Sequence, residues 1–114
     1  EAKGITDSLK ANQPLQKVYI NSIADSLCAP IHMPYSFSIA KQVIDEMLNI
    51  SDKDMSEAMI FAYKHLKLFL EPACVAGFAA LKKLQYKNFK EQNTLILLCG
   101  SNIDFQSWNS IVAN

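Results

Sequence analysis

Apolar residues recur every three or four positions in several stretches of this chain, and this spacing predicts helices rather than strands. The clearest amphipathic helix is expected over residues 36–48, where charged residues occupy the face opposite the apolar one. A second helix is expected over residues 51 to about 70, because Ser51 and Asp54 form a capping-box pattern at its start. Shorter helices are expected at residues 5–11, at residues 72–84 and after Asp104.

The most apolar stretch is residues 95–98, which are four consecutive branched aliphatic residues without a charge. Such a run predicts a buried strand that is covered on both faces. It leads into residues 99–102, which are small, and open α/β sheets bind ligands at the carboxyl ends of their strands. The pattern therefore predicts an α/β fold, richer in helix than in strand, with only two or three short strands. A sheet this small is expected to be completed by strands that lie elsewhere.

Composition narrows the class of protein. At 114 residues, half of them hydrophobic, the chain is long enough for one domain and too short for two. Eleven basic and eleven acidic residues cancel, which argues against a nucleic-acid partner. The apolar runs are far too short to span a membrane, and no secretory signal opens the chain. The first residue is Glu1 rather than Met, so we expect that the chain was cut from a longer one.

Two residue types exclude further classes of site. The three cysteines, Cys28, Cys74 and Cys99, lack a paired spacing, which predicts a reducing, cytoplasmic location and no zinc site. Only three glycines occur, so a glycine-rich loop that cradles phosphate is absent from this chain.

Three motifs carry a resemblance to a known family. They are Ser-Ile-Ala-Asp at residues 22–25, Leu-Phe-Leu-Glu-Pro-Ala at residues 68–73 and Leu-Cys-Gly-Ser-Asn-Ile-Asp at residues 98–104. In order and spacing they resemble the C-terminal part of the threonine dehydratase and serine racemase group, pyridoxal-phosphate enzymes of fold type II (tryptophan synthase β-like). The resemblance implies that residues 1–114 are a single partial domain: the helix-rich C-terminal portion of a three-layer catalytic domain with a small, mostly parallel sheet.

The resemblance also implies a cofactor site. Cys99 would face the pyridine nitrogen of pyridoxal 5'-phosphate, and Gly100, Ser101 and Asn102 would form the wall beside the ring. Glu71 resembles the family glutamate near that ring. A neutral thiol leaves the ring less electron-withdrawing than a carboxylate would, which suits β-elimination. The alternative is that Cys99 only packs and that Glu71 is a surface residue at a helix end.

A divalent-cation site is implied near the start of the chain. Its ligands would be the Glu1 carboxylate, the Ile5 backbone carbonyl and the Asp7 carboxylate. Ligands that are all oxygen suit Mg²⁺ or Ca²⁺. The alternative is that Asp7 lies in the first turn of a helix, where acidic residues are favoured.

Three residues depart from the family pattern at positions where glycine is common: Ser26, Cys74 and Ser101. Each adds a side chain in a region that approaches the cofactor. They bear on the identity of the substrate more than on the fold.

The activity implied by the resemblance is that of a threonine or serine ammonia-lyase (dehydratase), which converts the amino acid to a 2-oxo acid and ammonia. The Schiff-base lysine and the phosphate loop lie upstream in the family, and no lysine here has the Ser-Phe-Lys context, so this chain alone is expected to be inactive. Two alternatives stay open: an amino-acid racemase of the same family, and a non-catalytic α/β binding or interaction remnant. A homo-oligomer is expected, because an isolated C-terminal piece would expose apolar faces.

Overall fold

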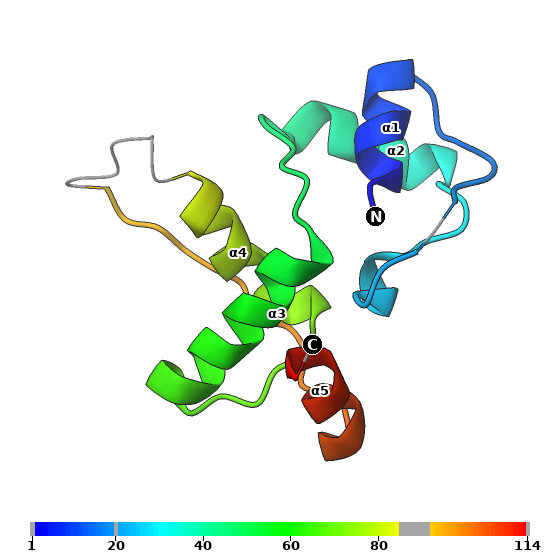
Figure 1. The fold of residues 1–114 in the computed structure, drawn as a ribbon. Helices are drawn as coiled ribbons and strands as arrows, with labels where there is room; N and C mark the ends of the chain where they lie inside the picture. The colour runs from blue at the N-terminus through cyan, green and yellow to red at the C-terminus, as the bar shows by residue number, and fades with distance from the viewer. Residues whose placement is uncertain (1, 20, 85–91, 114) are drawn as a thin grey trace. The chain divides into compact units, whose positions relative to one another are not determined.

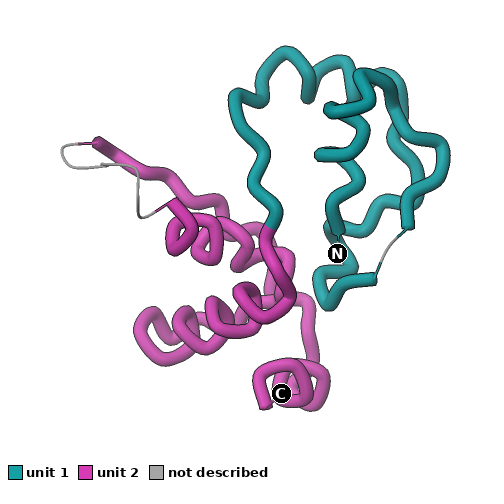
Figure 2. The backbone as a smooth tube through the Cα atoms, turned by 45° about the horizontal axis from the view of Figure 1, so that its top comes forward, with its two compact units in different colours: residues 1–49 teal, residues 50–114 magenta. Residues whose placement is uncertain are grey.

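The computed structural model describes residues 2–19, 21–84 and 92–113, and these fall into two compact units, residues 1–49 and 50–114 (Figure 2). The regular structure of the described ranges is helical, and they contain no strand. No helix in these ranges is long and apolar enough to cross a membrane.

Unit 1 contains two helices, α1 (Gly4–Ala11) and α2 (Pro34–Val43), with a 3₁₀ turn, η1 (Asp25–Leu27), between them in the chain. The two helices contact each other (Figure 1). The chain leaves α1 through Asn12, whose φ of 56° is a left-handed conformation that asparagine tolerates at a helix end. The helix expected at residues 5–11 is thus confirmed.

The helix expected at residues 36–48 is displaced towards the N-terminus. It begins at Pro34, because proline suits the first turn of a helix, where its missing N–H costs no hydrogen bond. It ends at Val43, and Ile44 takes an extended conformation with ψ of 115°. The apolar pattern of the predicted helix therefore continues past the helix that forms.

A buried polar contact joins α1 to the loop before α2. Ser8 is fully buried, and its Oγ lies 2.6 Å from Nδ1 of His32. The same Ser8 Oγ accepts the Leu15 N–H at 3.1 Å. His32 is half-buried and forms part of the packing of unit 1.

Unit 2 contains five helical elements: α3 (Asp52–Phe61), the π-helical turn η2 (Ala62–Leu66), the 3₁₀ turn η3 (Ala73–Val75), α4 (Ala76–Lys83) and α5 (Phe105–Val112). α3 packs against both α4 and α5 (Figure 1). The core of the unit lies where these helices meet, and its most buried side chains are Met55, Met59, Ala62, Cys74, Val75, Ala79 and Trp108.

The two predicted N-caps of unit 2 are confirmed. Ser51 Oγ accepts the Asp54 N–H at 3.1 Å, and Asp54 Oδ2 accepts the Ser51 N–H at 3.2 Å, which is the reciprocal pair of a capping box. Asp104 Oδ1 accepts the Ser107 N–H at 2.9 Å at the start of α5. Both helices begin where short polar side chains satisfy free backbone donors.

The helices expected at residues 51–70 and 72–84 are shorter than predicted. The first changes to a π-helical turn after Phe61 and ends at Lys67, whose φ of 60° is left-handed. The second opens as the 3₁₀ turn η3 and becomes α-helical only at Ala76. Residues 74, 75 and 79 of this stretch are buried.

The structure of residues 95–98 differs from the buried strand that the sequence predicts. They form no strand, and the side chains of Leu95 and Leu97 are 94% and 79% exposed. A strand of this kind is buried only when neighbouring strands and helices cover it, and no described segment pairs with it as a strand. The prediction of a buried strand is therefore wrong for this chain, and the small parallel sheet stays a prediction.

Candidate functional site

The two motifs at residues 68–73 and 98–104 meet in unit 2. The Glu71 N–H donates to the Gly100 carbonyl oxygen at 3.4 Å. The Asn102 N–H donates to Oε2 of Glu71 at 3.2 Å. Glu71 therefore contacts the 98–104 segment through both its backbone and its side chain, across about thirty residues of sequence.

Cys74 makes a third contact with the same segment. Its side chain is buried, with 2% exposed, and its Sγ accepts the Gly100 N–H at 3.3 Å. The Cys74 N–H donates to the Glu71 carbonyl oxygen at 3.1 Å, which places the two side chains one helical turn apart. The backbone of Gly100 is thus held at its N–H by Cys74 and at its carbonyl by Glu71.

Two glycines permit this close approach. A Cβ on Gly77 would lie 2.7 Å from Cγ2 of Ile96, which is shorter than carbon atoms tolerate. A Cβ on Gly100 would overlap the Glu71 carboxylate. Residues 71, 74 and 77 therefore all contact the segment of residues 96–102. We call this set of contacts the 71–77 clamp.

The structure brings together three of the five residues predicted to bind the cofactor. Glu71 is hydrogen-bonded to the backbone of both Gly100 and Asn102. Cys99 and Ser101 flank Gly100 in the chain, and the side chains of both are exposed. In this chain Cys99 is not a buried packing residue, so its thiol is open to a ligand.

Sequence reasoning missed the role of Cys74. The sequence indicates this residue only as a departure from a family glycine, whereas in the structure its sulfur accepts a hydrogen bond from the Gly100 N–H. The available signal was its position three residues after Glu71 at the start of a helix, because residues three apart on a helix share a face.

The residues present fit the pyridine ring of the cofactor chemically. Residues 99–102 present a thiol, a hydroxyl and an amide, and none of them carries a charge. On the side of Gly100 where a Cβ would stand, the Glu71 carboxylate fills the space. The one carboxylate of the cluster, that of Glu71, is already bonded to the Asn102 N–H.

The predicted cation site gains no support. Glu1 lies outside the described residues, and Ile5 and Asp7 lie in α1. The Asp7 N–H donates to the Lys3 carbonyl at 3.0 Å, which is an ordinary first-turn contact. Within the part of the chain that the structure describes, no three His, Cys, Asp or Glu residues are grouped as metal ligands would be.

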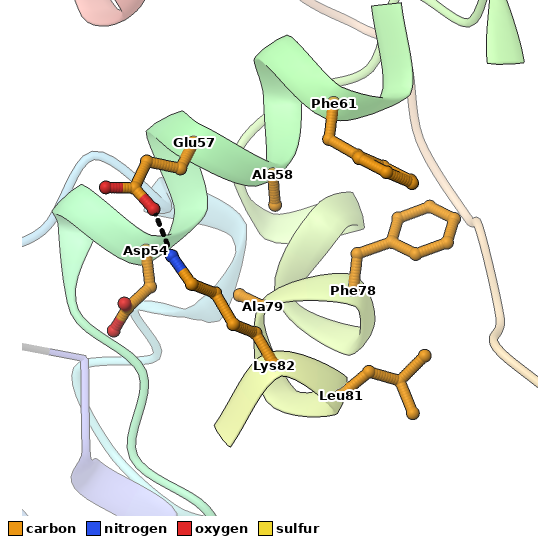
Figure 3. A pocket seen from close by; sticks show the side chains of 8 residues that line it. All are labelled: Asp54, Glu57, Ala58, Phe61, Phe78, Ala79, Leu81 and Lys82. Atoms are coloured by element: carbon orange, nitrogen blue, oxygen red, sulfur yellow. Dashed lines mark hydrogen bonds and ion pairs between the residues drawn. The ribbon is translucent and has the colours of Figure 1, made fainter. Parts of the chain in front are cut away.

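A pocket of about 470 Å³ lies between α3 and α4 (Figure 3). Phe61 and Phe78 line its apolar side, and Lys82 Nζ lies 2.5 Å from Glu57 Oε2 at its polar side. The hydrogen bond and charge attraction between these two groups lower the pKa of Glu57 and raise the pKa of Lys82. Because the two charges satisfy each other and none of the predicted site residues lines the pocket, the pocket is separate from the candidate site.

Comparison with known proteins shows the family to which the chain belongs. Residues 1–100 match the family model described as pyridoxal-phosphate dependent enzyme, so the chain belongs to this family. Its fold matches the processed form of threonine deaminase isoform 2 from Solanum lycopersicum, with a TM-score of 0.83, 22% identity, and coverage of 98% of this chain and 33% of that one. The fold is therefore that of part of a fold type II enzyme.

The chain is also similar in sequence to particular enzymes. The chain is 34% identical over 97 residues to phenylserine dehydratase from Ralstonia pickettii, covering 85% of this chain and 30% of the relative. It is 30% identical over 74 residues to serine racemase from Schizosaccharomyces pombe, covering 65% and 23%. The chain thus spans less than a third of the length of these relatives.

Proposed function

We propose that this chain forms part of a pyridoxal-phosphate-dependent ammonia-lyase that converts threonine, serine or a related β-hydroxy amino acid to a 2-oxo acid and ammonia. The observation that carries the proposal is the contact of Glu71 with Gly100 and Asn102. These residues belong to two separate motifs of the resemblance, and they form one cluster beside the exposed Cys99.

In this proposal each residue of the cluster has a physical task. Cys99 offers an uncharged thiol to the ring nitrogen, and residues 100–102 line one side of the ring. Glu71 holds the loop in place through the Asn102 N–H. When bound, the cofactor supplies an electron-withdrawing ring that stabilises negative charge at the substrate Cα. A neutral partner at the ring nitrogen moderates this withdrawal and favours loss of the β-hydroxyl.

We further propose that the 114 residues do not catalyse the reaction alone. The resemblance assigns the lysine that binds the cofactor covalently to another part of the family chain, and no lysine here has its sequence context.

We also propose a cytoplasmic location, because three free thiols suit a reducing compartment.

The test uses the full-length product of the gene that encodes this chain. With pyridoxal phosphate added, we expect visible absorbance from the lysine-bound cofactor, and we expect 2-oxo acid and ammonia from threonine or serine. Cys99→Asp should slow elimination at least about tenfold, because a carboxylate keeps the ring nitrogen protonated. Cys99→Ser is the matched control and should keep most of the activity, since a hydroxyl is also neutral.

Other outcomes identify the alternatives. Equal rates for Cys99→Asp and the wild type would refute the assigned contact. A racemase, which the Schizosaccharomyces pombe relative favours, would convert L-serine to D-serine as its main product on chiral chromatography. Absence of cofactor absorbance in the full-length protein would support a non-catalytic remnant.

A further inference from the structure

We propose that Cys74 is a positioning residue of this site: its sulfur holds the Gly100 N–H and so sets the orientation of Cys99. The inference rests on the proposed function, because it concerns how the contact to the ring nitrogen is held. It assigns a task to a buried thiol that would otherwise only fill the core.

The peptide group between Cys99 and Gly100 connects this hydrogen bond to the orientation of Cys99. This group is planar, so fixing the direction of the Gly100 N–H fixes the plane that also contains the Cα of Cys99. Cys74 Sγ accepts that N–H at 3.3 Å. On the other side of Gly100, the Glu71 N–H holds the carbonyl at 3.4 Å. The peptide is therefore held immediately after the residue whose side chain must face the ring.

Burial makes this hydrogen bond effective. Sulfur is a weak acceptor, and in water it would lose the N–H to solvent. Cys74 is 2% exposed, so little water reaches its sulfur to compete. A glycine or alanine at residue 74 has no acceptor in its side chain, and the Gly100 N–H would lose this partner.

Gly77, the third residue of the 71–77 clamp, further restricts movement of residues 96–102. Gly77, one turn further along, packs so closely on Ile96 that no Cβ fits between them. The site segment is therefore fixed at residue 96 by packing and at residue 100 by hydrogen bonds. Cys99 lies inside this fixed stretch while its own side chain stays exposed.

The experiment measures the position of the Cys99 thiol in the full-length protein. Alkylation by iodoacetamide is followed peptide by peptide with mass spectrometry, with and without pyridoxal phosphate. In the wild type the cofactor should slow alkylation of Cys99. In Cys74→Ala this protection should fall about fivefold, and kcat should fall by a similar factor with KM little changed, as for loss of one weak hydrogen bond.

Two matched variants serve as controls. Cys74→Ser keeps a side-chain acceptor and should restore most of the protection. Cys28→Ala removes a different half-buried thiol, whose Sγ donates to the Ala24 carbonyl at 3.1 Å, and should change neither protection nor kcat. Circular dichroism checks that each variant is folded, and if Cys74→Ala does not fold, Cys74→Gly replaces it, with the same expected loss.

The outcomes separate the two proposals. If Cys74→Ala protects Cys99 as well as the wild type does, Cys74 is not a positioning residue, and the proposed function stands. If the cofactor does not protect Cys99 even in the wild type, the proposed function fails. In that case hydrogen exchange of residues 99–103 without cofactor tests the contact by itself, and exchange about fivefold faster in Cys74→Ala is expected. Unchanged exchange would overturn the contact.

Discussion

Residue 77 is where a single methyl group decides whether α4 can hold the site segment. In most helices alanine is more stable than glycine by about 1 kcal/mol. Here an added Cβ would lie 2.7 Å from Cγ2 of Ile96, which is close to the backbone and branched, so it cannot swing aside easily. The local preference of the helix and the packing of the segment therefore oppose each other at this position.

We therefore expect the effect of Gly77→Ala on the free energy of unfolding to change sign when the Ile96 side chain is shortened. We expect Gly77→Ala to destabilise the chain by about 1 kcal/mol, because an overpacking cost of about 1–3 kcal/mol exceeds the gain in helix propensity. In an Ile96→Ala background, which removes the obstructing methyl groups, the same change should be neutral or stabilising. Urea unfolding followed by the fluorescence of the single Trp108 measures both. An equal effect in the two backgrounds would contradict the contact.

At the scale of the element, the start of α3 depends on one carboxylate. The hydrogen bonds from Ser51 to Asp54 lower the pKa of Asp54, and Lys83 Nζ at 3.4 Å lowers it further. A carboxyl group whose pKa is lower in the folded state stabilises the fold above its unfolded pKa of about 4. That stabilisation is lost as the pH falls from about 4 through the lower folded value.

Replacement of this carboxylate should therefore have a pH-dependent effect. At pH 7 we expect Asp54→Ala to cost about 1 kcal/mol through loss of the capping box. As the pH falls below about 4 the difference from the wild type should shrink, since the wild-type carboxylate progressively becomes protonated. Urea midpoints at pH 7 and pH 3 measure this, with Asp54→Asn as a control that keeps an acceptor without the charge. A difference that stays constant with pH would refute the role of the charge.

At the scale of the molecule, residues 95–98 leave apolar side chains in solvent. Leu95 and Leu97 are among the most exposed large hydrophobic residues that the structure describes. Exposed apolar segments of this kind promote association, particularly when their backbone groups are also unpaired with a neighbouring strand. The chain covers 30% of the length of phenylserine dehydratase, so this relative has further residues outside the matched region.

The chain by itself is therefore expected to self-associate. Leu95→Lys with Leu97→Lys should lower the apparent mass in light scattering without loss of helix content, because both side chains already lie in solvent. Asn93→Lys adds a charge to the same exposed segment without removing an apolar side chain and should change little. A clean monomer for the unmodified chain would contradict the expectation.

The sequence by itself determined the helices, their caps and the family. The capping box at Ser51 and the Asp104 cap depend on contacts three residues apart, so they follow from local sequence in any context. The pairing of Glu71 with the 98–104 motif was accessible only through the resemblance. The helix ends at Val43 and Phe61 were predicted too late, because apolar spacing continues where the backbone changes conformation.

The tertiary structure alone decided which residues hold the site and whether residues 95–98 are covered. The bond from the Gly100 N–H to Cys74 spans 26 residues, and no local pattern predicts which buried atom accepts a given N–H. The exposure of Leu95 has the same origin, because an apolar run is buried only if distant segments supply its neighbours. Local sequence sets each element, and long-range partners decide what that element covers.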